Sequence, residues 1–190
     1  MRYKTASVFA VMVASAAPAF GDSSGSSRIT IRGTAEQVCV MPPPRSTGAS
    51  NAAFDGDVAT ISDLIDDGTA TVNPFSLQIT YTNVMCNYNA SVSLTSTRGG
   101  LQQIDGEQNV VSSSGALLNE IDYTAQLTWG GMALPVLDTT SLSGTGRVES
   151  LAGGANAADL VLTITAAKGD TPVLLGNYED TLIINIGANP

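Results

Sequence analysis

Few side chains in this chain could carry out chemistry. Among its 190 residues there are two cysteines and no histidine. Without histidine, the chain alone cannot supply a Ser–His or Cys–His nucleophile pair, and the common zinc sites are excluded too. Residues 21–25, GDSSG, match the G-x-S-x-G pattern of serine hydrolases, but that pattern needs a preceding strand, a following helix and a base. We therefore expect no enzyme, and no cofactor or catalytic residue.

Five aspartates gather in the segment between residues 55 and 67. Oxygen-rich loops can bind calcium, but the EF-hand spacing, with glycine at the sixth position and glutamate at the twelfth, is absent. The simpler interpretation is a solvated acidic loop, with a calcium site as the alternative. The residues concerned are Asp55, Asp57, Asp63, Asp66 and Asp67.

The first nineteen residues are typical of a secretory signal peptide. Arg2 and Lys4 precede an apolar stretch over 6–17, and the small residues Ala17 and Ala19 predict cleavage after Ala19. The rival interpretation, a membrane anchor, is disfavoured because the stretch is shorter than the roughly 20 apolar residues that span a bilayer. We expect export through the periplasm and no stable membrane insertion.

Export would place Cys39 and Cys86 in an oxidising compartment. As the only two cysteines, they are expected to form a single disulfide, with two buried free thiols as the alternative. The formal charge of the whole chain is −9, from 17 acidic and 8 basic side chains. This excess of acid argues against a nucleic-acid partner, because phosphate backbones are bound mainly by lysine and arginine.

Apolar and polar residues alternate with a period of two in several segments, which is the pattern of half-buried strands. After the signal peptide, we find no segment of ten or more residues with helical periodicity. The pattern predicts an all-β sandwich in a single domain. Residues 45–70 are expected to form a long polar connection with a short helical or strand segment at 59–65. The predicted strands are 28–35, 75–81, 90–95, 123–129, 160–165 and 181–186.

Two strands near the chain ends are unusual. Residues 28–35 alternate cleanly after a Gly/Ser-rich leader, and residues 182–186 form a strongly apolar strand close to the C-terminus. An exposed apolar strand edge invites pairing with another chain, so pairing itself could be the function. Tyr123 and Trp129 share one face of a predicted strand, and core packing explains them better than an aromatic ligand platform.

The C-terminal residues 176–184, GNYEDTLII, resemble the G-x-Y-x-D-T ending of the spore coat protein U domain family, the pilin subunits of archaic, Csu-type chaperone–usher pili. The matching positions are Gly176, Tyr178, Asp180 and Thr181. Residues 33–39, 85–86 and 123–130 are also similar to the family, and the resemblance extends over residues 28–187. Classical fimbrial subunits end in a similar tyrosine motif.

The resemblance implies an immunoglobulin-like sandwich that lacks its last strand. Residues 1–19 would be the signal peptide, 20–35 a donor-strand segment and 36–190 the pilin-like domain. A periplasmic chaperone would lend the missing strand during folding, and an outer-membrane usher would assemble subunits into a surface fibre for adhesion or biofilm formation. The alternative is a secreted carbohydrate- or surface-binding sandwich, similar to a tip adhesin module.

Donor-strand pairing assigns roles to both ends of the chain. Main-chain hydrogen bonds would give affinity, and alternate side chains entering a groove would give register. The donor side chains would be Ile29, Ile31, Gly33 and Ala35 of a neighbouring subunit. The groove edge that receives them would comprise Val38, Val40, Leu182, Ile184 and Ile186.

Overall fold

The computed structural model describes residues 26–106, 117–151 and 154–188. The chain divides into two compact units, residues 1–35 and residues 36–190, the second of which we call the body. The expected signal peptide and the GDSSG segment lie outside the described residues.

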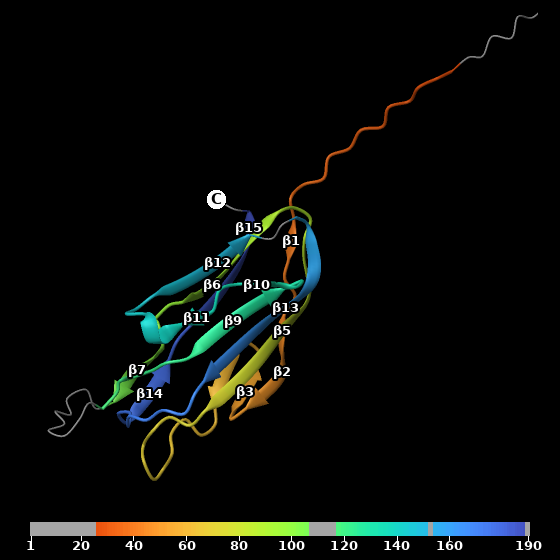
Figure 1. Cartoon of the computed structure of the whole chain (residues 1–190). Coiled ribbons are helices and arrows are strands. Elements are labelled where there is room, and N and C mark those ends of the chain that lie inside the picture. Colours follow the sequence, from red (N-terminus) through yellow and green to blue (C-terminus); the bar gives the residue numbers. More distant parts are fainter. Residues whose placement is uncertain (1–25, 107–116, 152–153, 189–190) are drawn as a thin grey trace, which may run out of the picture. The chain divides into compact units, whose positions relative to one another are not determined.

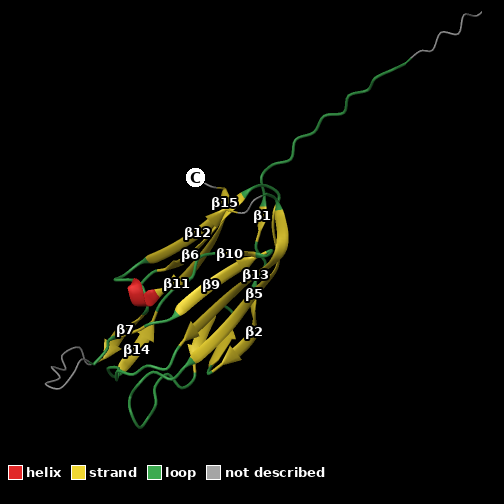
Figure 2. Cartoon of the chain, in the orientation of Figure 1, coloured by secondary structure: helices red, strands yellow, loops and turns green. Residues whose placement is uncertain are grey.

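The body is built almost entirely from strands (Figures 1 and 2). Among the described residues, the largest sheet has the central order β1-β5-β13-β9-β10, with β2 pairing to β5 and β11 pairing to β9, and every pair is antiparallel. Its strands are β1 (Cys39–Val40), β2 (Pro44–Ser50), β5 (Phe75–Cys86), β9 (Thr124–Trp129), β10 (Met132–Ala133), β11 (Leu137–Asp138) and β13 (Asn156–Ala166).

A second sheet has the order β12-β6-β15, from strands β12 (Gly146–Leu151), β6 (Ala90–Ser96) and β15 (Leu182–Ala188). A third comprises β14 (Gly176–Glu179), β7 (Leu101–Gly106) and β8 (Glu120–Ile121). Strands β3 (Ala52–Asp55) and β4 (Val58–Ile61) form a separate hairpin, and a 3₁₀ turn, η1, spans Thr139–Ser141.

The largest sheet and the β12-β6-β15 sheet share one hydrophobic core. Leu77 and Ile79 of β5 meet Val92 and Leu94 of β6 in that core, and Trp129 is fully buried within it. The indole nitrogen of Trp129 donates to the carbonyl oxygens of both Val84 and Ala158, at 3.2 Å each. The all-β, sandwich-like fold predicted from the sequence is therefore confirmed, and Trp129 is a core residue.

The expected strands at 75–81, 90–95, 123–129, 160–165 and 181–186 are all present, and each end lies within five residues of its predicted position. Throughout the described ranges, the one helical element is the three-residue turn η1. None of the helical structure described is long and apolar enough to cross a membrane.

The expectation of a long polar connection was wrong for residues 45–61, whereas the strand segment expected at 59–65 overlaps β4. Strand β2 occupies 44–50 and pairs with β5 through six partner positions, and the β3–β4 hairpin follows directly. The residues of β2, PRSTGAS, lack apolar alternation and strand propensity. Their pairing with β5 supplies the ladder that local propensity does not, because context overrides intrinsic preference in sheets.

The structure assigns no strand to residues 28–35, although the sequence predicted one. The side chains of Ile29 and Ile31 are 83% and 92% exposed, and nothing lies within 4 Å of where a Cβ on Gly33 would stand. A strand is defined by hydrogen bonds to a neighbouring strand, and no described strand pairs with this segment. The alternation is present in the sequence, but no described strand forms a ladder with this segment.

Candidate functional site

Strand β15 lies at the edge of its sheet. It pairs with β6 through seven partner positions, from Leu182 opposite Ser96 to Ala188 opposite Ala90, and no described strand pairs with its other edge. Leu182, Ile184 and Ile186 face the core but are only half-buried, while Ile183 points outward and is 42% exposed. This is a long, apolar strand edge with free backbone groups.

A groove of about 460 Å³ runs beside this edge. Leu182 and Ile184 form one wall, and the β3–β4 hairpin, with Phe54 and Ile61, contributes another part of the lining. Apolar side chains from β5 and β13 also line it: Phe75, Leu77, Ile79, Leu162 and Ile164. The groove therefore opens directly onto the sandwich core, where a side chain entering from outside would contact buried residues.

The Asp180 carboxylate organises the groove end where β15 begins. Oδ2 accepts hydrogen bonds from the hydroxyls of Ser96 and Tyr123, both at 2.5 Å. Oδ1 accepts from the hydroxyl of Thr97 and from the backbone nitrogens of Arg98 and Thr181. One side chain thus connects the end of β6, the start of β9 and the start of β15, and it holds the edge strand in place.

Tyr123 lies in the groove lining and is almost fully buried. Burial raises the pKa of its hydroxyl well above the usual value, and the hydrogen bond to Asp180 and the negative charge of that carboxylate raise it further. At neutral pH the phenol is therefore protonated and donates its hydrogen bond to Asp180.

The other residues of the C-terminal motif have structural roles as well. A Cβ on Gly176 would collide with the carbonyl oxygen of Asp105 and the side chain of Gln103, so β14 can approach β7 only with glycine there. The Tyr178 hydroxyl donates to the carbonyl oxygen of Leu174 at 2.7 Å and lies 3.2 Å from that of Leu118. The motif positions β14 and then delivers the chain into β15.

The disulfide expected between Cys39 and Cys86 is present and joins β1 to β5. Val38 and Val40 flank Cys39, but each is nearly half exposed and neither is among the residues that line the groove. Since successive side chains of a strand alternate between faces, an inward Cys39 directs its two neighbours outward. Ile186 continues the inward face of β15 beyond the groove lining.

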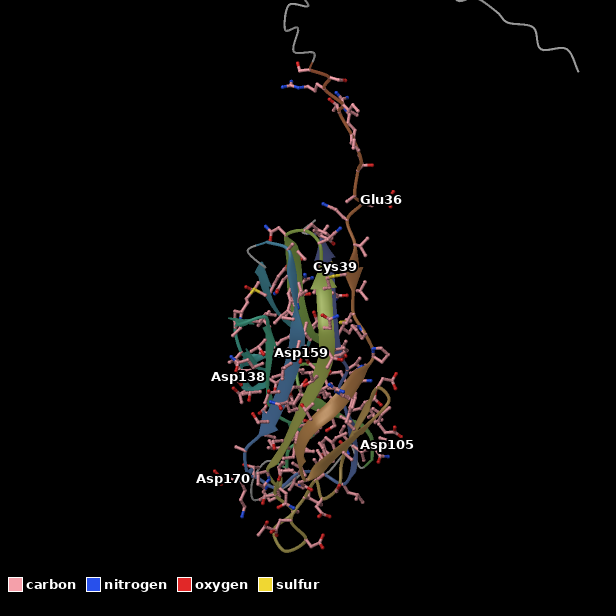
Figure 3. The ribbon with its side chains drawn as sticks, turned by 90° about the vertical axis from the view of Figure 1, so that its right-hand side faces the viewer. Glu36, Cys39, Asp105, Asp138, Asp159 and Asp170 are labelled. Atoms are coloured by element: carbon pink, nitrogen blue, oxygen red, sulfur yellow. A yellow bond between two sulfur atoms is a disulfide. The ribbon has the colours of Figure 1, made fainter. Side chains whose placement is uncertain are left out.

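The body begins at the end where β15 finishes. The Asn87 side chain donates a hydrogen bond to the carbonyl oxygen of Glu36 at 2.8 Å. The backbone nitrogen of Asn87 donates to the carbonyl oxygen of Val38 at 3.1 Å. Residue 87 belongs to the short connection between β5 and β6, and Ala90 pairs with Ala188 at the end of β15. Figure 3 shows Glu36 and Cys39 toward one end of the body, and Asp105 and Asp170 toward the other.

The acidic segment between the cysteines does not form a metal-binding cluster. In residues 26–106, 117–151 and 154–188, no three His, Cys, Asp or Glu side chains gather as metal ligands. Asp66 instead accepts hydrogen bonds from Thr69 and Gly68, which hold its pKa below the usual value. Its carboxylate stabilises a local turn.

The β3–β4 hairpin that lines part of the groove was not predicted from the sequence as a hairpin. Gly56 and Asp57 form the two-residue connection between β3 and β4, and Gly56 has a φ of +63°. A Gly-Asp pair between two short runs that contain apolar residues is a hairpin signal. The high density of aspartates obscured that signal, because it suggested a loop.

None of the protein-family models, curated proteins or solved structures compared with the chain matches it. The function must therefore be inferred from the chain's own residues and geometry.

Proposed function

We propose that this protein is a secreted structural subunit of a surface fibre, in which residues 28–35 of one copy complete the sandwich of the next. The observation that carries the proposal is the unpaired edge of β15 beside an apolar groove. This arrangement is the one expected of the chaperone–usher pilins that the C-terminal motif resembles. A periplasmic chaperone and an outer-membrane usher would be its assembly partners.

The groove and the segment are complementary in kind. The groove offers a strand edge and apolar side chains, and residues 28–35 offer alternating apolar side chains with no strand partner. Burying an exposed isoleucine stabilises by about 2 kcal/mol, so Ile29 and Ile31 together provide a substantial driving force before ordering costs. Gly33 and Ala35 would occupy positions where less space remains.

The position of Glu36 determines which copy can donate in which direction. Antiparallel to β15, an inserted segment would have residue 35 at the Asp180 end, whereas Glu36 of the same copy lies at the opposite end. Seven residues of β15 span about 24 Å, so one chain cannot satisfy both positions. Antiparallel insertion therefore requires a second copy, and repeated insertion builds an open, head-to-tail polymer.

The disulfide agrees with a secreted protein. Disulfides form and persist in the periplasm and outside the cell, and reducing compartments remove them. Closing the loop between Cys39 and Cys86 stabilises the body by about 4 kcal/mol in the chain-entropy account.

The proposal is tested by expressing the full chain in a bacterium and examining the exported product on unheated SDS gels and by electron microscopy. We expect heat-sensitive ladders and fibres from the unaltered chain. Deletion of residues 20–35 should abolish both, and so should Ile31→Asp, because a charge would enter the apolar groove. Thr30→Asn is the control, because residue 30 would point away from the groove and the change adds no charge to the face that carries Arg28 and Arg32.

A cooperative monomer that is indifferent to the deletion and to Ile31→Asp would overturn the proposal. The equal loss of fibres in Ile31→Asp and Thr30→Asn would also contradict it, since the side chain that enters the groove would then play no part.

A further inference from the structure

Charge is divided unequally between the segment and the body. Residues 26–35 contain two arginines, Arg28 and Arg32, and no acidic residue. Residues 36–190 contain sixteen acidic and four basic side chains. If residues 28–35 insert into the groove of a second copy, as the proposed function requires, a basic strand approaches a strongly acidic body.

Acidic side chains also lie at the groove itself. Asp57, in the turn of the β3–β4 hairpin, and Glu179, the last residue of β14, both line it. Asp57 is exposed and forms no ion pair within the described residues. Glu179 is 53% exposed and has one ion pair, with Arg98 at 3.5 Å. Asp180 also lines the groove, but its oxygens are engaged by five hydrogen bonds.

The alternation of the segment determines which side chains would meet this acidic rim. When Ile29 and Ile31 point into the groove, Arg28 and Arg32 point out of it, because successive side chains of a strand face opposite sides. The two arginines are four positions apart, so they lie on the same face about 13 Å from each other. In the antiparallel register, Arg32 lies nearer than Arg28 to Glu179 at the Asp180 end, and both arginines add positive charge that attracts the segment to the acidic rim.

We propose that the acidic rim of Asp57 and Glu179 makes the groove selective for a basic donor strand, and that the strand it selects is residues 28–35 of another copy of this chain. Charges at a solvent-exposed rim act mainly on the rate of association and on the choice of partner, and less on final affinity. The isoleucines hold the strand, and the arginines accelerate its capture.

The test uses the full mature chain carrying Ile29→Asp and Ile31→Asp, so that its own segment cannot fill a groove. The probe is a fluorescent peptide with the sequence of residues 26–37, and stopped-flow anisotropy measures its association rate. The comparison peptides carry Arg28→Gln with Arg32→Gln, or Arg28→Lys with Arg32→Lys. A peptide with Ile31→Asp serves as the non-inserting control.

At about 20 mM salt, we expect the glutamine peptide to associate about tenfold more slowly than the unaltered peptide, and the lysine peptide to retain most of the rate. At about 500 mM salt, the three rates should converge, because screening removes the attraction. Asp57→Asn with Glu179→Gln in the receiving chain should reduce the advantage of the arginine peptide. Asp170→Asn with Asp138→Asn removes the same charge away from the groove and should leave most of that advantage.

Two results would count against the inference in different ways. Equal rates for the arginine and glutamine peptides, or equal effects of the rim and distant acid variants, would overturn charge selection and leave strand insertion intact. If no peptide binds in any salt, both the inference and the proposed function fail.

Discussion

Strands β6 and β15 are neighbours of equal length in one sheet, and their burial is opposite to their composition. Strand β6 reads ASVSLTS, and six of its seven residues are buried. Strand β15 reads LIINIGA, and none of its residues is buried. Strand β6 has β12 on one side and β15 on the other, whereas β15 has a partner on one side only. Neighbours, and not apolar content, decide the burial of these two strands.

The comparison explains why β15 is the candidate site. A self-sufficient sandwich places its most apolar strand at the centre of a sheet and protects its edges with polar or charged side chains. Here the apolar strand is the edge, and the polar serines and threonines are in the centre. An exposed edge of this composition fits a strand that is completed by another chain.

The largest expected effect comes from the doubly paired strand. Leu94 is fully buried on β6, so Leu94→Ala should lower the free energy of unfolding by about 3 kcal/mol through lost contacts and a cavity. Urea unfolding of the exported chain measures the loss. The control is Ile183→Ala, on the outer face of β15, which should cost less than about 0.5 kcal/mol. Similar losses in both variants would break the comparison.

The next effect concerns the residue that anchors β15. Asp180→Asn keeps the shape of the side chain but replaces one acceptor oxygen and the negative charge, so hydrogen bonds from Ser96, Tyr123 or Thr97 are lost. We expect a loss of about 2 kcal/mol in unfolding free energy. Asp170→Asn is the control, since no side-chain hydrogen bond of Asp170 is described. If the two variants are equally stable, the anchor at Asp180 is unimportant.

A pH experiment examines the same anchor without removing it. Because the pKa of Tyr123 is higher in the folded chain than the usual 10, its stabilising contribution is complete below pH 10 and is lost as pH rises above it. At pH 11 the loss should reach about 1.4 kcal/mol, one unit above the unfolded pKa. Tyr123→Phe should be less stable at pH 7 but lose less stability between pH 9 and pH 11.

Chemical denaturation at matched pH values distinguishes Tyr123 from Tyr81 and Tyr178, whose pKa values are also raised and which remain in the variant. If Tyr123→Phe and the unaltered chain lose stability in parallel above pH 9, the pKa of Tyr123 is not raised in the folded chain.

The smallest effect on the isolated chain is expected at the groove wall. Ile184→Ala should cost about 1 kcal/mol in the monomer, because the side chain is only half-buried. In fibres, the same variant should lower the dissociation temperature more strongly, since an inserted strand would complete the burial. Thermal dissociation on gels measures this, with Ile183→Ala as the outward-facing control. An effect of equal size in monomer and fibre would argue against filling of the groove.

The sequence was sufficient to predict the strands with clear alternation, because burial of one face leaves a period of two in the chain. It predicted the core position of Trp129 for the same reason. It also predicted the disulfide, because a chain that is expected to be exported and has two cysteines allows only one intramolecular pairing. Strand β2 was not predictable, since its residues carry no pattern and become a strand only through hydrogen bonds to β5.

Residues 28–35 show the reverse case, in which a clear pattern has no partner within the described chain. Leu182 and Ile184 were expected at a groove and line one, whereas Val38 and Val40 were expected there and lie elsewhere, because the inward position in β1 belongs to Cys39. The hairpin that forms part of the groove and the five hydrogen bonds to Asp180 join residues far apart in the chain. Local periodicity thus determined which segments can be strands, and only tertiary pairing decided which strand edges are paired and which stay open.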